Sequence, residues 1–226
     1  MVFAGLFSAL VKQEAAGAPR TAIPVTARGD TQVDTSTKKF GTGSCLIDGA
    51  GDYLEISTAY NSTFSFTGDF TIELWAYKRN TNSPQVLVSN WTYGFWLGYF
   101  GTNNFRVYVN STSGYISASY TPSTNTWVHY AVVRSGTTVT LYIDGTSYGT
   151  STKSGTVNMT KKTTFGSDQN VKFWNGNLEE IRISDTARYT ANFTPATSAF
   201  TNDSNTLLLL HCNGTNGSTS FPDDNT

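Results

Sequence analysis

The stretch that decides the fold is Trp127–Tyr148, which reads WVHYAVVRSGTTVTLYIDGTSY. Its residues alternate as in β-strands, and the pairs Ser135-Gly136 and Asp144-Gly145 divide it into three strands. A glycine in second place suits the positive backbone dihedrals of two-residue hairpin turns. The first strand, Trp127–Val133, is apolar on both faces, which indicates a central strand covered on both sides. The stretch therefore predicts an all-β layered domain.

The composition is typical of extracellular or virion β proteins. Of the 226 residues, 14% are charged, 14% are aromatic and 20 are glycine. Disordered chains have more charge and fewer aromatic residues. The net charge is −1 and there is no basic stripe, so we expect no nucleic-acid partner. No apolar run reaches the roughly 18 residues of a membrane span, so we predict none.

Residues 1–24 are predicted to form an N-terminal arm. Phe3, Leu6, Phe7 and Leu10 recur at the spacing of one face of a short amphipathic helix. A helix of about three turns is marginal alone in water. We therefore expect the arm to dock on the domain or to anchor the protein to a partner.

Residues 25–226 are predicted to form one β domain, because strand signals recur at short intervals between Gly, Asn, Ser and Thr. Such a series is typical of a sandwich or jelly roll. The apolar run at 207–210 has to be buried, and we expect a strand near 207–212 to close a sheet edge. Cys45 and Cys212 are too far apart in sequence for a CxxC motif. They are either buried free thiols or, if their strands lie side by side, a disulfide.

Four segments carry a family resemblance: FGTGSCLIDGAGDY at 40–53, FTIELWAY at 70–77, the stretch at 127–145, and FWNGNLEEIRIS at 173–184. Together they resemble the concanavalin A-like lectin/laminin G-like jelly-roll superfamily. The resemblance implies a two-sheet antiparallel jelly-roll sandwich.

A narrower resemblance concerns residues 186–221, TARYTANFTPATSAFTNDSNTLLLLHCNGTNGSTSF. This sequence is similar to lectin-like domains of bacteriophage structural proteins, in which a segment like LLLLHCNGTNGSTSF stands at the start of the domain. Here it stands at the end, so the chain looks permuted. Leu207–Cys212 is expected to fill the missing first-strand position in its own domain, or else to be donated to a neighbouring subunit.

Catalytic residues are not predicted. Glycosidases of the superfamily carry alternating carboxylates on one strand, of the form E-x-D-x-E, and no such strand occurs here. Glu73 stands alone, and Glu179 and Glu180 are adjacent, so we expect them to point to opposite faces. One of the two should be solvated and the other paired with Arg182 or a turn. His129 lies in a central strand and is expected to be structural, so we predict that the protein is not an enzyme.

Two kinds of binding site are predicted. Calcium is the one plausible metal, because Asp48, Asp52 and Glu179 lie on segments resembling those that hold it in related domains; the alternative is that the aspartates make turns. No other cofactor is expected. The aromatic run WTYGFWLGYF at 91–100 suggests carbohydrate binding by four rings, because aromatic faces stack on sugars; the alternative is a core and a subunit contact. The four rings are those of Trp91, Tyr93, Trp96 and Tyr99.

These features favour a non-enzymatic virion structural protein, a bacteriophage capsid decoration protein whose lectin-like domain projects outward. The alternative is a carbohydrate- or receptor-binding module of a phage tail fibre or an extracellular adhesin. The expected partners are other virion or filament subunits, further copies of the chain in a homo-oligomer, and a glycan ligand. The expected location is the virion surface or another extracellular position.

Overall fold

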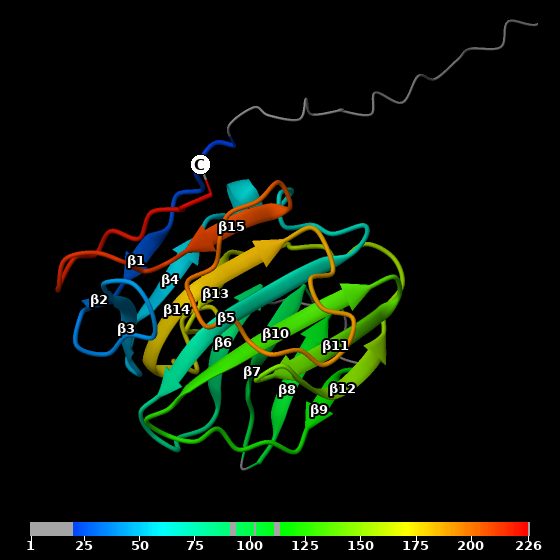
Figure 1. The fold of residues 1–226 in the computed structure, drawn as a ribbon, viewed down its shortest axis with the longest axis horizontal. Coiled ribbons are helices and arrows are strands. Elements are labelled where there is room, and N and C mark those ends of the chain that lie inside the picture. The colour runs from blue at the N-terminus through cyan, green and yellow to red at the C-terminus, as the bar shows by residue number, and fades with distance from the viewer. Residues whose placement is uncertain (1–19, 91–93, 102, 111–113, 226) are drawn as a thin grey trace, which may run out of the picture.

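The computed structural model describes residues 20–90, 94–101, 103–110 and 114–225, which form two antiparallel sheets stacked face to face (Figure 1). The seven-stranded sheet contains, in spatial order, β1 (Thr26–Arg28), β4 (Tyr53–Ile56), β13 (Thr163–Phe165), β6 (Gln85–Asn90), β7 (Phe95–Tyr99), β8 (Phe105–Val109) and β9 (Ile116–Ala118). The eight-stranded sheet contains β12 (Thr146–Thr152), β11 (Thr138–Ile143), β10 (Trp127–Ser135), β5 (Phe70–Lys78), β14 (Asn175–Ser184), β3 (Ser44–Asp48) and β2 (Gln32–Asp34), and its β15 (Thr206–Leu210) also pairs with β14.

This architecture confirms the predicted all-β two-sheet sandwich. A single 3-10 turn, η1 (Thr58–Tyr60), is the one helical element of the described residues. The predicted arm helix with Phe3, Leu6, Phe7 and Leu10 lies outside the described residues. Within the described part of the chain, no helix is long and apolar enough to cross a bilayer.

The deciding stretch forms β10, β11 and the first three residues of β12. Asp144 and Gly145 have φ values of 46° and 74°, which is the type I′ geometry that matches the twist of a hairpin. The first turn is shifted by one residue from the predicted pair: Ser135 still pairs with Thr138, so the turn consists of Gly136 and Thr137. β10 lies between β11 and β5, in the central position that its apolar faces predicted.

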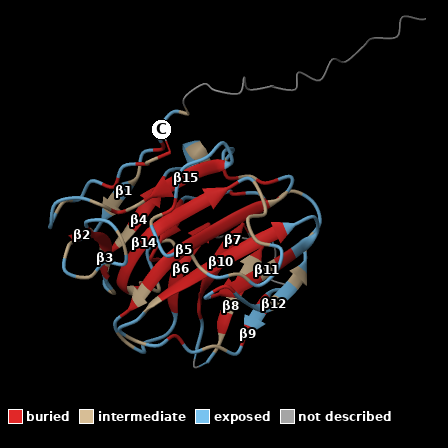
Figure 2. Ribbon diagram, viewed as in Figure 1, coloured by how far each residue is buried: buried red, intermediate tan, exposed pale blue. Residues whose placement is uncertain are grey.

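The main core fills the space between the two sheets. Phe105 of β8 stacks on Tyr130 of β10 with ring centroids 4.9 Å apart, which is a direct contact between the two sheets. The strands β5, β10, β14 and β15 are buried almost throughout, whereas β12 at the edge is exposed (Figure 2).

The outer face of the eight-stranded sheet is also covered. Residues 185–205, which we call the strap, cross in front of β5, β10 and β11 (orange in Figure 1). Phe200 of the strap packs with Trp75 of β5, and Phe193 packs with Ala131 and Tyr142. The strap explains why the 127–133 strand is apolar on both faces.

The C-terminal segment belongs to the domain. β15 and β3 pair with the same edge of β14, end to end, because Ile181 faces Leu210 and Leu178 faces Cys45. Cys45 and Cys212 are both buried free thiols. β1 and β2 follow each other closely in the sequence but lie in different sheets.

Candidate functional site

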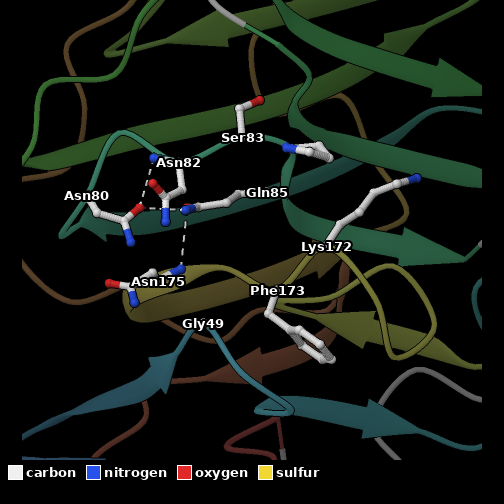
Figure 3. Close-up of a pocket in the computed structure, with 9 residues that line it drawn as sticks. Gly49, Asn80, Asn82, Ser83, Gln85, Lys172, Phe173 and Asn175 are labelled. Carbon is white, nitrogen blue, oxygen red and sulfur yellow. Dashed lines mark hydrogen bonds between the residues drawn. The ribbon is translucent and has the colours of Figure 1, made fainter.

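A polar pocket opens at the end of the sandwich where β5 leads into β6 and where β14 begins (Figure 3). We call it the end pocket. It has a volume of about 260 Å³, which suits one sugar ring or a ligand of similar size. Its walls come from the 79–84 loop, the segment before β14, and the turn between β3 and β4. The lining residues are Gly49, Asn80, Asn82, Ser83, Pro84, Gln85, Lys172, Phe173 and Asn175.

Amide side chains form the floor of the end pocket, and hydrogen bonds hold them in place (Figure 3). The Asn80 Oδ1 atom accepts from the backbone N–H of Asn82 at 3.1 Å and from Gln85 Nε2 at 2.7 Å. Gln85 Oε1 accepts from the backbone N–H of Asn175 at 3.3 Å. The Asn175 side chain donates to the main-chain oxygen of Asp48, which ties the β3–β4 turn to the site. Because each amide has both donor and acceptor atoms, this floor is suited to hydroxyl-bearing ligands.

Lys78, the last residue of β5, lies directly behind this floor. Its Nζ donates to Gln85 Oε1 at 2.9 Å and to the main-chain oxygen of Asn82 at 3.1 Å. The side chain is only 2% exposed, and burial lowers the pKa of Lys78 to about 8. The floor of the end pocket therefore rests on a buried ammonium group.

Lys172 and Phe173 form one side of the pocket. Lys172 has a left-handed backbone with φ of 54°, and its Nζ lies 2.7 Å from Asp168 Oδ2. The Phe173 ring packs at 6.3 Å from the ring of Tyr53, leaving it half-buried at the pocket wall. This wall adds an apolar face to a site otherwise built from amides.

Of the four predicted sugar-binding rings, the structure describes two, and neither of them lines the end pocket. Trp91 and Tyr93 lie outside the described residues. Trp96 is 3% exposed, because Phe100 and Tyr108 cover it on the outer face of the seven-stranded sheet.

The fourth ring, Tyr99, is also 3% exposed and belongs to the main core. Neither Trp96 nor Tyr99 presents an open face in this chain. The open aromatic surface nearby consists of Phe100 and Tyr115, each about 40% exposed, with the Arg106 guanidinium 4.3 Å from the Phe100 ring centre.

The three predicted calcium ligands do not converge. Asp52 accepts backbone N–H groups from Asp30 and Asp48 at 2.6 and 3.2 Å. Asp48 faces Asn175 at the start of β14, whereas Glu179 lies four positions further along that strand. Among the described residues, no group of three or more Asp, Glu, His or Cys side chains is arranged to hold a metal ion. Asp48, Asp52 and Glu179 thus do not fit a shared calcium site.

Glu179 and Glu180 correct another expectation, because they lie on the same side of the sheet. A β-bulge separates Glu179 from Arg182, and Glu180 has a φ of 52°. Alternation therefore fails here: the flanking Leu178 and Ile181 both enter the main core, and both carboxylates lie on the strap side.

Neither of these carboxylates is solvated. Glu179 accepts the backbone N–H groups of Lys39 and Phe40, both at 2.6 Å. Glu180 accepts the Phe200 N–H at 2.6 Å and bonds to His211 Nδ1 at 2.7 Å. Arg182 pairs instead with Glu73, at 2.7 Å. All the oxygens of the pair are engaged in holding loops.

The sequence did not single out the amides of the end pocket. Asn80, Asn82 and Asn175 stand in a chain rich in Asn, Ser and Thr, so they resemble ordinary loop residues. One signal was available: the segment NTNSPQ at 80–85 concentrates amides directly after a strand.

Comparison with known proteins gives a family and a fold. A model of the concanavalin A-like lectin/glucanases superfamily matches residues 48–192. No curated protein matches the chain. Among solved structures, domain 4 of AbnA, a GH43 extracellular arabinanase from Geobacillus stearothermophilus, has a TM-score of 0.55 and 13% identity, covering 73% of this chain and 82% of that one.

Two toxin structures are also similar. The binding domain of Paraclostridial Mosquitocidal Protein 1 has a TM-score of 0.58 and 18% identity, covering 74% of this chain and 45% of that one. A botulinum neurotoxin type C structure has a TM-score of 0.55 and 16% identity, covering 74% and 44%. The chain thus spans less than half of each toxin structure, and at these identities the likeness shows the fold alone.

Proposed function

The chain belongs to the concanavalin A-like lectin/glucanases superfamily, and from that premise we propose that it is a non-enzymatic carbohydrate-binding module whose ligand site is the end pocket. The observation that carries this proposal is the floor of fixed amides, in which Gln85 is held by Asn80 and Asn175. Prearranged donors and acceptors lose little freedom when a ligand binds. Sugar hydroxyls match them, and Phe173 offers an apolar wall to the sugar C–H groups.

Two of the similar structures support a sugar ligand. The arabinanase domain was solved in complex with arabinotriose, and the neurotoxin is described as entering cells by interaction with two ganglioside molecules. The bound arabinotriose of the one and the ganglioside interaction of the other are the grounds on which we extend carbohydrate recognition to this chain.

The buried carboxylates favour binding over hydrolysis. A glycosidase needs two carboxyl groups that reach the scissile bond from an open cleft. Here Glu73, Glu179 and Glu180 are each at most 1% exposed. Their positions beneath the strap and the neighbouring loops leave no room for a substrate at these groups.

A glycan array tests the proposal. We expect the full chain to bind a subset of glycans, and Asn82→Ala to reduce that binding at least tenfold, because Asn82 is an exposed residue that lines the pocket. Asn205→Ala is the matched control, since Asn205 is an exposed asparagine beside the opposite end of β14. Absence of glycan binding, or equal losses in the two variants, would rule out this site.

We also propose that the module is displayed on a virion surface, as a capsid decoration protein or, alternatively, in a tail fibre or adhesin, alongside further copies of the chain. The similarity of residues 186–221 to lectin-like domains of bacteriophage structural proteins supports this placement. In the fold that segment forms the strap, β15 and the C-terminal tail, all of which are part of the domain.

Deletion of residues 1–19 tests the anchoring part of this proposal. The first described residue, Arg20, lies at the surface and donates to the main chain of Ser204, so the sandwich should remain folded without the arm. We expect the shortened chain to have the same unfolding midpoint as the full chain, but no longer to sediment with the virus particles. Sedimentation unchanged by the deletion would refute anchoring by Phe3, Leu6, Phe7 and Leu10.

A further inference from the structure

The ammonium group behind the end pocket has no charged partner among the described residues. The Nζ atom of Lys78 lies between the pocket floor and two rings, those of Tyr99 at 5.3 Å and Trp174 at 5.4 Å. Its hydrogen bonds go to neutral oxygens of Asn82 and Gln85. A buried charge is costly unless an opposite charge or strong hydrogen bonds compensate it.

The neighbouring cations are compensated. Arg79 lies 3.0 Å from Asp34 Oδ2, and Lys172 lies 2.7 Å from Asp168 Oδ2. Lys78 forms no ion pair with any described carboxylate, and burial alone accounts for its lowered pKa. The pocket lining contains no acidic side chain. The end pocket is therefore a polar concavity over an unpaired positive charge.

We propose that the end pocket selects a sugar that carries a carboxylate, whose negative charge compensates the ammonium of Lys78 across the floor of Asn82 and Gln85. This inference rests on the proposed carbohydrate-binding function and specifies its ligand. A neutral sugar could use the amides equally well, but only an acidic sugar gains from the charge behind them.

Proton linkage follows from this arrangement. An anion in the pocket favours the charged form of Lys78, so its binding raises the pKa of Lys78 from about 8 and takes up protons near pH 8. The affinity for an acidic sugar should fall as the pH rises through 8, because more of the lysine is neutral. The other charged or titratable groups that face this region are Tyr99 on β7 and the ion pairs Arg79–Asp34 and Lys172–Asp168.

The experiment is calorimetric titration of the full chain with two matched pairs of sugars. One pair is trigalacturonate and its neutral galactose counterpart, and the other is sialyllactose and lactose, so the two arms separate uronic from sialic acids. We expect one acidic sugar to bind at least tenfold more tightly than its neutral match at pH 7. This advantage should fall at least fivefold at pH 9.5, and binding at pH 8 should take up protons.

Lys78→Met should remove the preference for the acidic sugar, so that the acidic sugar binds no more tightly than its neutral match. The matched control is Lys161→Met, which changes the same charge at an exposed lysine bonded to Asn90, at the opposite end of β6 from Gln85. If Lys78→Met does not fold, the pH dependence and the proton uptake of the natural chain decide the question.

Three results separate the two proposals. An acidic preference with proton uptake supports the inference. Equal affinity for acidic and neutral sugars in both pairs would overturn the inference and leave the carbohydrate-binding function standing. If no glycan binds, either in these titrations or on the array, both the acidic-sugar inference and the carbohydrate-binding function are overturned.

Discussion

At the scale of single residues, the buried carboxylate of Glu73 is the most heavily bonded charge beneath the strap. It accepts from Arg182 at 2.7 Å and from the Tyr189 hydroxyl at 2.8 Å, and it lies 3.2 Å from His129 Nε2. Burial raises the pKa of Glu73, but the hydrogen bond from His129 and the charge of Arg182 outweigh that effect and hold it below its usual range. The carboxylate therefore remains ionised inside the protein and links β5 to β14 and to the strap.

Glu73→Gln should lower the free energy of unfolding by about 3–5 kcal/mol, because it leaves Arg182 buried without its partner. The comparison is Glu55→Gln, whose partners Arg28 and Lys162 are about half exposed, so its loss should be about 1 kcal/mol or less. Urea denaturation at pH 7 measures both. Equal losses would show that the Glu73 network contributes no more than a surface pair.

The pKa of Glu179 is shifted in the opposite direction from that of Glu73, and this makes the stability of the fold depend on pH. Burial raises the pKa of Glu179 to about 7, and the hydrogen bond to Glu180 raises the pKa of His211. A group whose pKa is higher in the folded protein stabilises it when protonated. That contribution is complete below the unfolded pKa, about 4.3 for Glu and 6.5 for His, and is lost as the pH rises through the folded pKa.

As Glu179 titrates, the free energy of unfolding should therefore decline between about pH 4.3 and pH 7, and Glu179→Gln should make this decline shallower. Glu55→Gln is again the control, because the pKa of Glu55 is lowered and its titration lies below this window. Urea denaturation across the pH range tests the prediction. A slope in Glu179→Gln as steep as in the natural chain would contradict it.

The sequence identified candidate residues, but it did not predict how exposed they are or which backbone conformation they adopt. The aromatic run singled out Trp96 and Tyr99 as candidate sugar-binding rings, but their exposure depends on Phe100, Tyr108 and the opposing sheet, which sequence pattern alone does not position. The bulge at Glu180 was equally hidden, because a left-handed glutamate has no signature in the sequence.

At the scale of elements, β15 is the strand by which the C-terminal part of the chain completes the eight-stranded sheet. Its residues are all buried, and it pairs with β14 of the same chain through Leu208, Leu209 and Leu210. Two further contacts secure it: Asp223 accepts the N–H of Leu209 at 3.1 Å and the N–H of Ile23 at 3.0 Å. The last segment thus joins β15 to the start of the domain.

Leu208→Ala should lower the free energy of unfolding by about 2–5 kcal/mol, because Leu208 is fully buried in the main core. Val171→Ala, at an exposed apolar residue, should change it by less than about 0.5 kcal/mol. The unfolding midpoint of the natural chain should not depend on protein concentration. A midpoint that rises with concentration would instead indicate that the strand is donated between subunits.

Element types were predictable from sequence, whereas their partners were only partly so. Alternation and the Asp144-Gly145 turn were enough to predict β10, β11 and β12. The placement of β1 and β2 in different sheets was not predictable, because a turn such as the one at Gly29 between them can equally interrupt a single strand. The strap was unpredictable, since an irregular segment has no period.

At the scale of the whole molecule, the two ends of the described chain meet and the sandwich leaves its polar pocket open at one end. The superfamily fold could be inferred from sequence because the series of hairpins and the family-like sequence segments both indicate a two-sheet β sandwich. The end pocket could not, because it is built where the 79–84 loop, the segment before β14 and the β3–β4 turn come together in space.

The central claim is that this end pocket, rather than the exposed aromatic surface at Phe100 and Tyr115, holds the sugar. Chemical-shift mapping of the labelled protein during titration with the best glycan from the array tests it most directly. The account predicts saturable shifts of the side-chain amides of Asn80, Asn82, Gln85 and Asn175. Shifts confined to residues around Phe100 and Tyr115, with those four amides unchanged, would contradict it.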